Sequence, residues 1–143
     1  MNAVHEQGVE TNLEKAVRLY QIASDRGDLS ATFNLGICYY TGKGVYKNLE
    51  EAVRLFQIAS NGGHLEATNN LGLCYKNGKG VEKNPEEAVR LYQIASDRGN
   101  LNAAINLGAC YCKGEGVEKN FEEAVRLFQI ASDGGNFYGT YNL

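Results

Sequence analysis

The nine residues "AVRLYQIAS", at positions 16 to 24, decide the fold because they return three more times along the chain. They recur as "AVRLFQIAS" at 52, "AVRLYQIAS" at 88 and "AVRLFQIAS" at 124, so only one of the nine positions varies. The copies are 36 residues apart. A repeat of about 20 to 50 residues is typical of a solenoid, in which each unit buries its apolar face against its neighbours.

A single unit can be read from residues 29 to 63. In "LSATFNLGICYYT" (29–41), Ala31, Leu35, Cys38 and Tyr39 have the spacing of one buried helix face. The glycines of "TGKGV" then permit the positive dihedral angles of a helix exit. A second helix begins at "NLEEAVRLFQIAS" and ends at the next glycines. The pattern predicts an all-α chain of αα-hairpins in tandem.

The starts of the second helices are predicted from their cap residues. Asn48 is a preferred N-cap, and the same start recurs at Asn12, Asn84 and Asn120. Pro85 follows one cap directly, where its missing donor costs nothing. We therefore divide 1–143, a single array, into a partial first unit at 1–27 (the end of a first helix plus a second helix), repeats at 28–63, 64–99 and 100–135, and the start of a further first helix at 136–143.

Three glycines lie inside the predicted first helices, where glycine costs about 1 kcal/mol relative to alanine. They are Gly36, Gly72 and Gly108. We expect another backbone to cross closely at these points. The tyrosines three residues on are expected to wedge between hairpins, with their hydroxyls reaching a rim. They are Tyr39, Tyr75 and Tyr111.

Composition excludes several classes of protein. A formal charge of -3 and a pI of about 5.4 leave no basic stripe for a nucleic acid. No apolar run approaches the roughly 20 residues of a membrane helix. The start "MNAVHEQGVE" is unlike a signal peptide, and no N-x-S/T sequon occurs, so we expect a cytoplasmic protein.

The pattern "LGxxYxxGxGVxKNxxEAVxLYxxASDxGxxxA" resembles the consensus of the Sel-1-like repeat family, relatives of the tetratricopeptide repeats, over essentially the whole chain. The resemblance implies a right-handed superhelical αα-hairpin solenoid. It also implies a concave surface, formed by the first helices, that holds partner proteins or peptides. Members of the family act as adaptors in quality control, signalling and bacterial envelope assembly.

The 36-residue register is similar to that of the cysteine-rich Helicobacter branch, in which a disulfide joins the end of a second helix to the start of the next first helix. The positions that correspond to this disulfide are Ser24 with Thr32, Ser60 with Thr68, and Ser96 with Ala104. The departure weakens any transfer of the penicillin-binding activity claimed for that branch.

Four cysteines remain to be interpreted. Cys38, Cys74 and Cys110 lie on the core stripe, so we expect free, buried thiols that act as small apolar side chains. Cys112 lies on another face and is expected to be partly exposed. Because His5 and His64 fall in loops and match no cysteine spacing, we expect no metal and no cofactor.

The stripe opposite the core of the first helices supplies the candidate partner-binding site. Apolar residues on it would form a groove, and exposed apolar patches of this kind mark binding sites. The predicted site comprises Phe33, Asn34, Ile37, Tyr40, Asn69, Asn70, Leu73, Lys76, Asn102, Asn106 and Lys113. If the superhelix is tighter, Ile37, Leu73 and Ala109 belong instead to the core between repeats.

One stripe position keeps its identity in every unit: Asn34, Asn70, Asn106 and Asn142. An unpaired asparagine does not pack in a core, so two interpretations compete. In the first, its amide bridges adjacent hairpins or caps a backbone carbonyl. In the second, it binds the backbone of an extended peptide, as the resemblance to tetratricopeptide domains implies.

These observations favour a non-catalytic interaction scaffold, or adaptor, with a protein or peptide partner. An enzyme of β-lactamase or penicillin-binding type is the alternative, although the sequence shows no Ser/His/Asp set and no phosphate loop. An architectural or designed repeat module without a ligand is a third class. Both termini fall inside a first helix, which predicts either an excised segment of a longer array or head-to-tail self-association.

Overall fold

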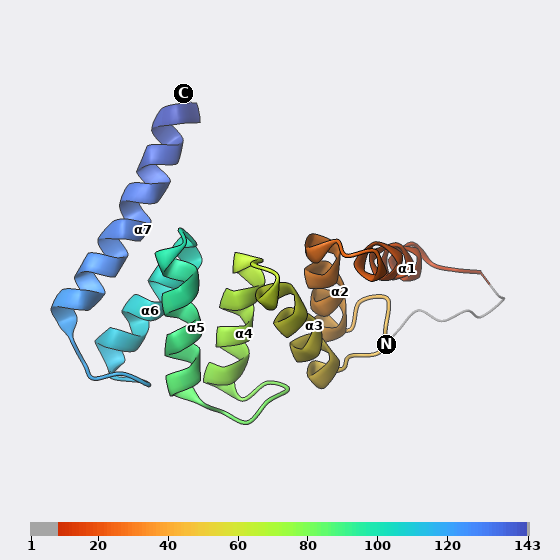
Figure 1. Ribbon diagram of the computed structural model, residues 1–143, viewed down its shortest axis with the longest axis horizontal. Coiled ribbons are helices and arrows are strands. Elements are labelled where there is room, and N and C mark those ends of the chain that lie inside the picture. The colour runs from red at the N-terminus through yellow and green to blue at the C-terminus, as the bar shows by residue number, and fades with distance from the viewer. Residues whose placement is uncertain (1–8, 143) are drawn as a thin grey trace.

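The computed structural model describes residues 9–142, with side chains described over residues 9–134. This part of the chain is helical and contains no strand. Its helices are α1 (Asn12–Asp25), α2 (Leu29–Thr41), α3 (Leu49–Asn61), α4 (Leu65–Asn77), α5 (Pro85–Asp97), α6 (Leu101–Lys113) and α7 (Phe121–Asn142). Figure 1 shows them following one another along the long axis of the molecule.

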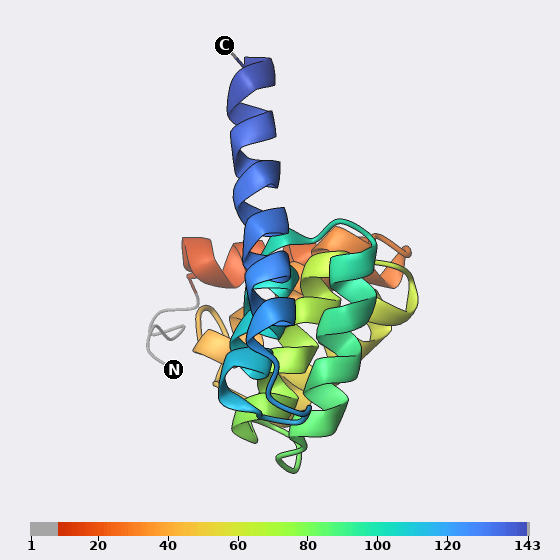
Figure 2. The ribbon, with the colours of Figure 1, turned by 90° about the vertical axis from the view of Figure 1, so that its left-hand side faces the viewer.

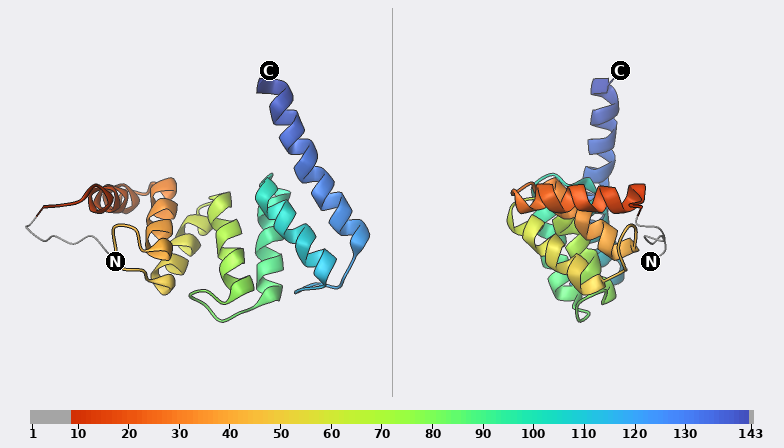
Figure 3. Two further views of the ribbon diagram at one scale, coloured as in Figure 1. Left: turned by 180° about the vertical axis from the view of Figure 1, so that it is seen from behind. Right: turned by 90° about the vertical axis from the view of Figure 1, so that its right-hand side faces the viewer.

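The helices pack as consecutive hairpins, as the sequence predicts. α2 packs most closely on α3, α4 on α5, and α6 on α7. The next closest contacts join each second helix to the following first helix: α1 to α2, α3 to α4, and α5 to α6. Figure 3 shows α1 lying across one end of this superhelical array. The fold is therefore an all-α superhelix of αα-hairpins.

The core is continuous within hairpins and between neighbouring hairpins. One buried cluster contains Phe56 of α3 together with Leu71 of α4 and Leu91 of α5, and a second joins Tyr92 of α5 to Leu107 of α6. Tyr75 packs against both clusters and so lies between two hairpins, as predicted. Each unit thus completes the burial of its neighbour.

Three of the four predicted caps are confirmed. The side chains of Asn48, Asn84 and Asn120 accept hydrogen bonds from the third backbone N–H of their helices, at 3.0, 3.1 and 3.1 Å. The prediction for Asn12 is wrong, because Thr11 caps α1. Thr11 Oγ1 accepts from Glu14 N, and the Glu14 carboxylate accepts from Thr11 N, which forms a capping box. Asn12 then falls inside the first turn.

The glycine turn after each first helix joins neighbouring units. Gly42 ends α2 in the left-handed region, at a φ of 75°, as the sequence predicts. Gly44 also has a positive φ, of 78°, and a Cβ there would lie 2.6 Å from the carbonyl oxygen of Leu13 in the preceding second helix. Glycine is needed at this position for both reasons.

The glycines inside the first helices have a different role from the predicted one. A Cβ on Gly36 would lie 2.8 Å from the ring of Phe56, and a Cβ on Gly72 would lie 2.6 Å from the ring of Tyr92. The element that crosses closely is therefore an aromatic side chain of the second helix of the same hairpin, and not a backbone. The glycine makes room for a ring that also reaches the core between hairpins.

The last helix differs from the sequence prediction, which ends it near Gly134. Helix α7 continues to Asn142, and Figure 2 shows its C-terminal part projecting beyond the other helices. In an earlier unit the exit is fixed by the next first helix, whose cap residue His64 donates its backbone N–H to Ala59 O. In α7 the helix instead continues through Gly134, so its backbone carbonyls are satisfied within the helix. The predicted pairing of this segment with residues 1–8 falls on side chains outside the described residues.

Candidate functional site

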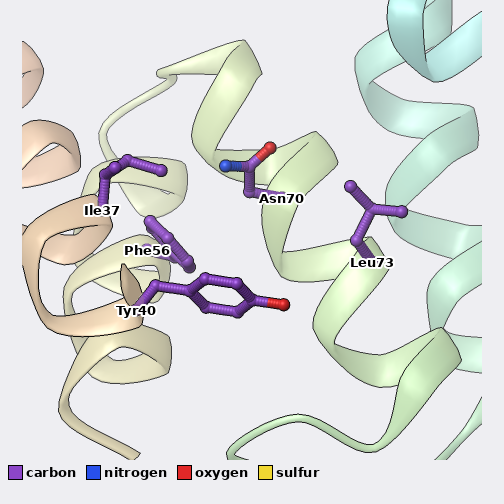
Figure 4. A pocket seen from close by; sticks show the side chains of 5 residues that line it. All are labelled: Ile37, Tyr40, Phe56, Asn70 and Leu73. Carbon is purple, nitrogen blue, oxygen red and sulfur yellow. The ribbon is translucent and has the colours of Figure 1, made fainter. Parts of the chain in front are cut away.

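A hollow of about 140 Å³ lies between two neighbouring first helices. Ile37 and Tyr40 of α2 form one wall, Asn70 and Leu73 of α4 form the other, and Phe56 of α3 lies at the base (Figure 4). On each wall the two residues are three apart, so they lie one helical turn from each other on one face. The periodic sequence thus places two neighbouring helices around one space.

The base and one end of the hollow are held by aromatic contacts. Phe56 is only 1% exposed, and its ring centroid lies 6.3 Å from that of Tyr40 and 5.7 Å from that of Phe33. Phe33 in turn stacks on His64, with ring centroids 4.7 Å apart. Burial raises the pKa of Tyr40, and the nearby Cys74 raises it further. Tyr40 is therefore an uncharged hydroxyl at neutral pH.

His64 has a role that the sequence analysis missed. It is the N-cap of α4, and its Nδ1 accepts a hydrogen bond from Ala67 N at 3.1 Å. The corresponding caps of α2 and α6 are Asp28 and Asn100, the residue types expected there. Only the alignment of the repeats could have indicated that His64 occupies a cap position. Its ring then fixes Phe33 beside the hollow.

The contact between α4 and α6 is closed by hydrogen bonds. Asn106 Nδ2 donates to Asn69 Oδ1 at 2.9 Å. One oxygen of Glu66 accepts from Asn100 Nδ2 at 2.7 Å and from Asn102 Nδ2 at 3.3 Å. Four of these residues belong to consecutive turns of the two facing helices, and Asn100 caps α6. The amides of this pair of first helices are thus directed at each other.

The asparagine that recurs in each unit therefore has more than one role. Asn106 bridges hairpins, which is the first of the two interpretations. Asn70 lines the hollow, and no residue in the described part of the chain hydrogen-bonds to its side chain. Asn34 is half-buried. The two pairs of first helices differ at one repeat position. In α4 this position is Asn69, which bonds Asn106. In α2 the same position is Phe33, whose side chain has no hydrogen-bonding group to offer Asn70.

The other predicted site residues are not all brought together. Phe33, Ile37 and Leu73 are half-buried and also pack against the core clusters, so the groove and the core between repeats share side chains. Asn102 and Lys113 are exposed and lie outside the hollow. Lys76 is half-buried. Burial raises the pKa of Cys110 and the charge of Lys76 lowers it, so the Lys76 ammonium group lies on the side of α4 that faces α6.

The cysteines have the character of core residues. Cys74 and Cys110 are 2% exposed, as predicted, whereas Cys38 and Cys112 are half-buried. Burial raises the pKa of the Cys74 thiol to about 11, so this thiol is protonated at neutral pH. Thiolate is the form that attacks and ligates. In the described part of the chain no three His, Cys, Asp or Glu residues gather in a way that could hold a metal ion.

At two of the three positions that correspond to the disulfide, the two side chains approach each other. Ser24 Oγ lies 2.5 Å from Thr32 Oγ1, and Ser60 Oγ lies 2.6 Å from Thr68 Oγ1. A hydrogen bond therefore joins successive helices where the cysteine-rich branch is expected to carry a covalent link.

Within residues 9–142, no helix combines the length and the apolar character that crossing a bilayer requires.

Comparisons with known proteins agree with this architecture. The Sel1 repeat model matches residues 4–28, 29–64, 65–100 and 101–136. The structure of a protective antigen of uropathogenic Escherichia coli, which displays an SLR fold, is 33% identical, with a TM-score of 0.80 over 83% of this chain and 26% of that one. A Sel1 repeat protein from Oxalobacter formigenes is 29% identical, with a TM-score of 0.84 over 90% and 51% of the two chains.

Cysteine rich protein B of Helicobacter pylori is 25% identical, with a TM-score of 0.69 over 90% of this chain and 92% of that one. The chain thus spans about a quarter of the E. coli antigen and about half of the Oxalobacter protein. The search of curated proteins gave no match. The repeat matches cover nearly all of the sequence, and the hairpins superpose on those of solved repeat proteins, so the chain belongs to the Sel1 repeat family.

Proposed function

We propose that this chain is a non-catalytic interaction scaffold that binds an extended segment of a partner protein across the α2–α4 groove. The groove is defined as the hollow lined by Ile37, Tyr40, Phe56, Asn70 and Leu73. Repeat proteins generally mediate protein interactions. The observation that carries the proposal is the combination of apolar walls with the amide of Asn70, which has no partner among the described residues.

The chemistry of the groove suits a polypeptide. A side-chain amide offers two donor hydrogens and an acceptor oxygen, which are the groups needed to pair with a peptide N–H and C=O. Apolar hollows with a few polar groups are the usual form of binding sites. Main-chain pairing at Asn70 and side-chain burial against Leu73 would use both features of the hollow.

The proposal can be tested by selecting binders from a displayed library of random peptides. We expect enriched peptides whose affinity for the chain drops when Asn70→Ala is introduced. Asn77→Ala is the matched control, because Asn77 is exposed on the same helix and does not line the hollow. Enrichment of no peptide, or equal affinity for both variants, would contradict the proposal.

The enzyme alternative needs its own measurement. The proposal expects no turnover of a chromogenic β-lactam by the purified chain. Hydrolysis that follows the protein through purification and is abolished by one serine or glutamate substitution would contradict a purely binding role.

A further inference from the structure

Building on the proposed function, we infer that the α2–α4 groove is a socket for one uncharged side chain, of leucine to phenylalanine size, carried by an extended peptide. Asn70 holds the main chain next to that side chain. The partner is thus a segment with a single apolar anchor at this point.

The size of the anchor follows from the volume of the hollow, about 140 Å³. An apolar cavity of about 150 Å³, lined by leucine, isoleucine and phenylalanine, holds one benzene molecule. The hollow therefore accommodates an isobutyl group or a phenyl ring. An indole is larger, and part of it would extend out of the open side of the hollow.

The chemistry of the anchor follows from the lining. None of the five lining residues carries a charge, and the ring of Phe56 closes the base. A charged side chain placed there would lose its hydration without gaining a partner. An apolar side chain instead gains contact with Ile37 and Leu73, while the Asn70 amide stays within reach of the adjoining peptide bond.

The neighbouring pair of first helices, α4 and α6, differs at the same repeat positions. One repeat further along, the residue equivalent to Asn70 is Asn106, which is already bonded to Asn69. Tyr40 is replaced by Lys76, and Phe56 is replaced by Tyr92, whose side chain is fully buried. The same repeat positions are therefore more polar, and a hydrogen bond joins α4 to α6 where the Asn70 amide lines the hollow.

The test uses a peptide obtained from the display selection, synthesised with its apolar anchor replaced in turn by alanine, leucine, phenylalanine, tryptophan and aspartate. For the unmodified chain we expect leucine and phenylalanine to bind best. Alanine should bind roughly tenfold to a hundredfold more weakly, because several buried carbon atoms are lost. Aspartate should not bind measurably.

The decisive experiment substitutes Leu73, which forms part of one wall of the groove. Leu73→Ala enlarges the socket, so tryptophan should become the preferred anchor and leucine should lose affinity. Leu73→Phe fills the socket, so the affinity of the alanine peptide should approach that of the leucine peptide. Ile58→Ala, on the exposed surface of α3 and outside the hollow, should leave the ranking unchanged. Circular dichroism checks that each variant is folded.

The outcomes separate this inference from the proposed function. If the peptide binds and Asn70→Ala weakens it, but the Leu73 variants do not alter the ranking of anchors, then the groove binds peptides and the socket is wrong. If toluene binds the chain and the peptide anchor makes no difference, the hollow takes free apolar molecules instead. A dimer in sedimentation experiments that Leu73→Phe dissociates would show that a second copy occupies it.

Discussion

The buried hydroxyl of Tyr92 is an unusual feature at the residue scale. The side chain is fully buried, and its oxygen has no hydrogen-bond partner in the described structure. Burial raises the pKa of Tyr92, with smaller contributions from Cys110 and Cys74, so the group is a neutral donor without an acceptor. The equivalent residue in two other units is phenylalanine, at Phe56 and Phe128.

Replacing this hydroxyl is expected to stabilise the protein. An unsatisfied buried polar group costs about 1 to 3 kcal/mol. Tyr92→Phe should therefore raise the free energy of unfolding by about 1 kcal/mol or more, measured by urea denaturation. Phe128→Tyr is the control: Phe128 is 37% exposed, so a hydroxyl there can reach water and should change little. A loss of stability in Tyr92→Phe would indicate that a bound water pairs with the hydroxyl.

At the scale of the element, three of the second helices, α3, α5 and α7, repeat one ion pair near their N-termini. Arg54 bonds Glu51, Arg90 bonds Glu87, and Arg126 bonds Glu123, at 2.5 to 2.6 Å. The hydrogen bond to arginine lowers the pKa of each of these glutamates. The pairs are exposed to solvent, so each is expected to contribute little on its own.

The lowered pKa values predict how stability depends on pH. Because the folded state binds protons less readily at these glutamates, their contribution is complete above the unfolded value of about 4.3. It is lost as the pH falls through the lowered folded values. The triple substitution of Glu51, Glu87 and Glu123 by Gln should therefore flatten the fall in the urea midpoint between pH 5 and pH 3.

The control for this prediction is the triple substitution of the neighbouring glutamates, Glu50, Glu86 and Glu122, by Gln. These residues share the first turn, and the structure shows no hydrogen bond or ion pair between them and an arginine. Added salt should reduce the difference between the two triple variants, because exposed charges are screened. Equal slopes for both would argue against the Glu–Arg pairs.

The elements themselves were predictable from the sequence, and their side-chain partners across hairpins were not. The residue range 29–41 follows directly from apolar spacing and a glycine exit, both of which are local signals. Asn106 is hydrogen-bonded because Asn69 faces it, whereas the residue at that position opposite Asn70 is Phe33. Which residues face each other depends on the register between helices that are far apart in sequence. The threonine cap of α1 was missed because two adjacent residues are both good caps.

At the scale of the whole molecule, burial is concentrated in the middle of the array. No residue of α1 is buried, and Leu13 and Leu19 on it are 48% and 49% exposed. At the other end, Phe121 and Val125 of α7 are 61% and 64% exposed. The equivalent residues of α3 and α5 are at least half-buried, because each of these helices packs against a helix on both sides, whereas α1 packs on α2 and α7 on α6.

This distribution predicts a gradient of local stability. In a repeat array, stability is approximately the sum of the units and their nearest-neighbour contacts, and terminal units have one contact fewer. Amide hydrogen exchange read by mass spectrometry should therefore be slowest in α4 and α5 and faster in α1 and α7. Leu91→Ala, which leaves a cavity in the central core, should speed exchange in α4 and α5 toward the rate of the ends. Uniform protection from α1 to α7 would mean that the array unfolds as one unit, so that the contacts between hairpins, and with them the α2–α4 groove, open and close together.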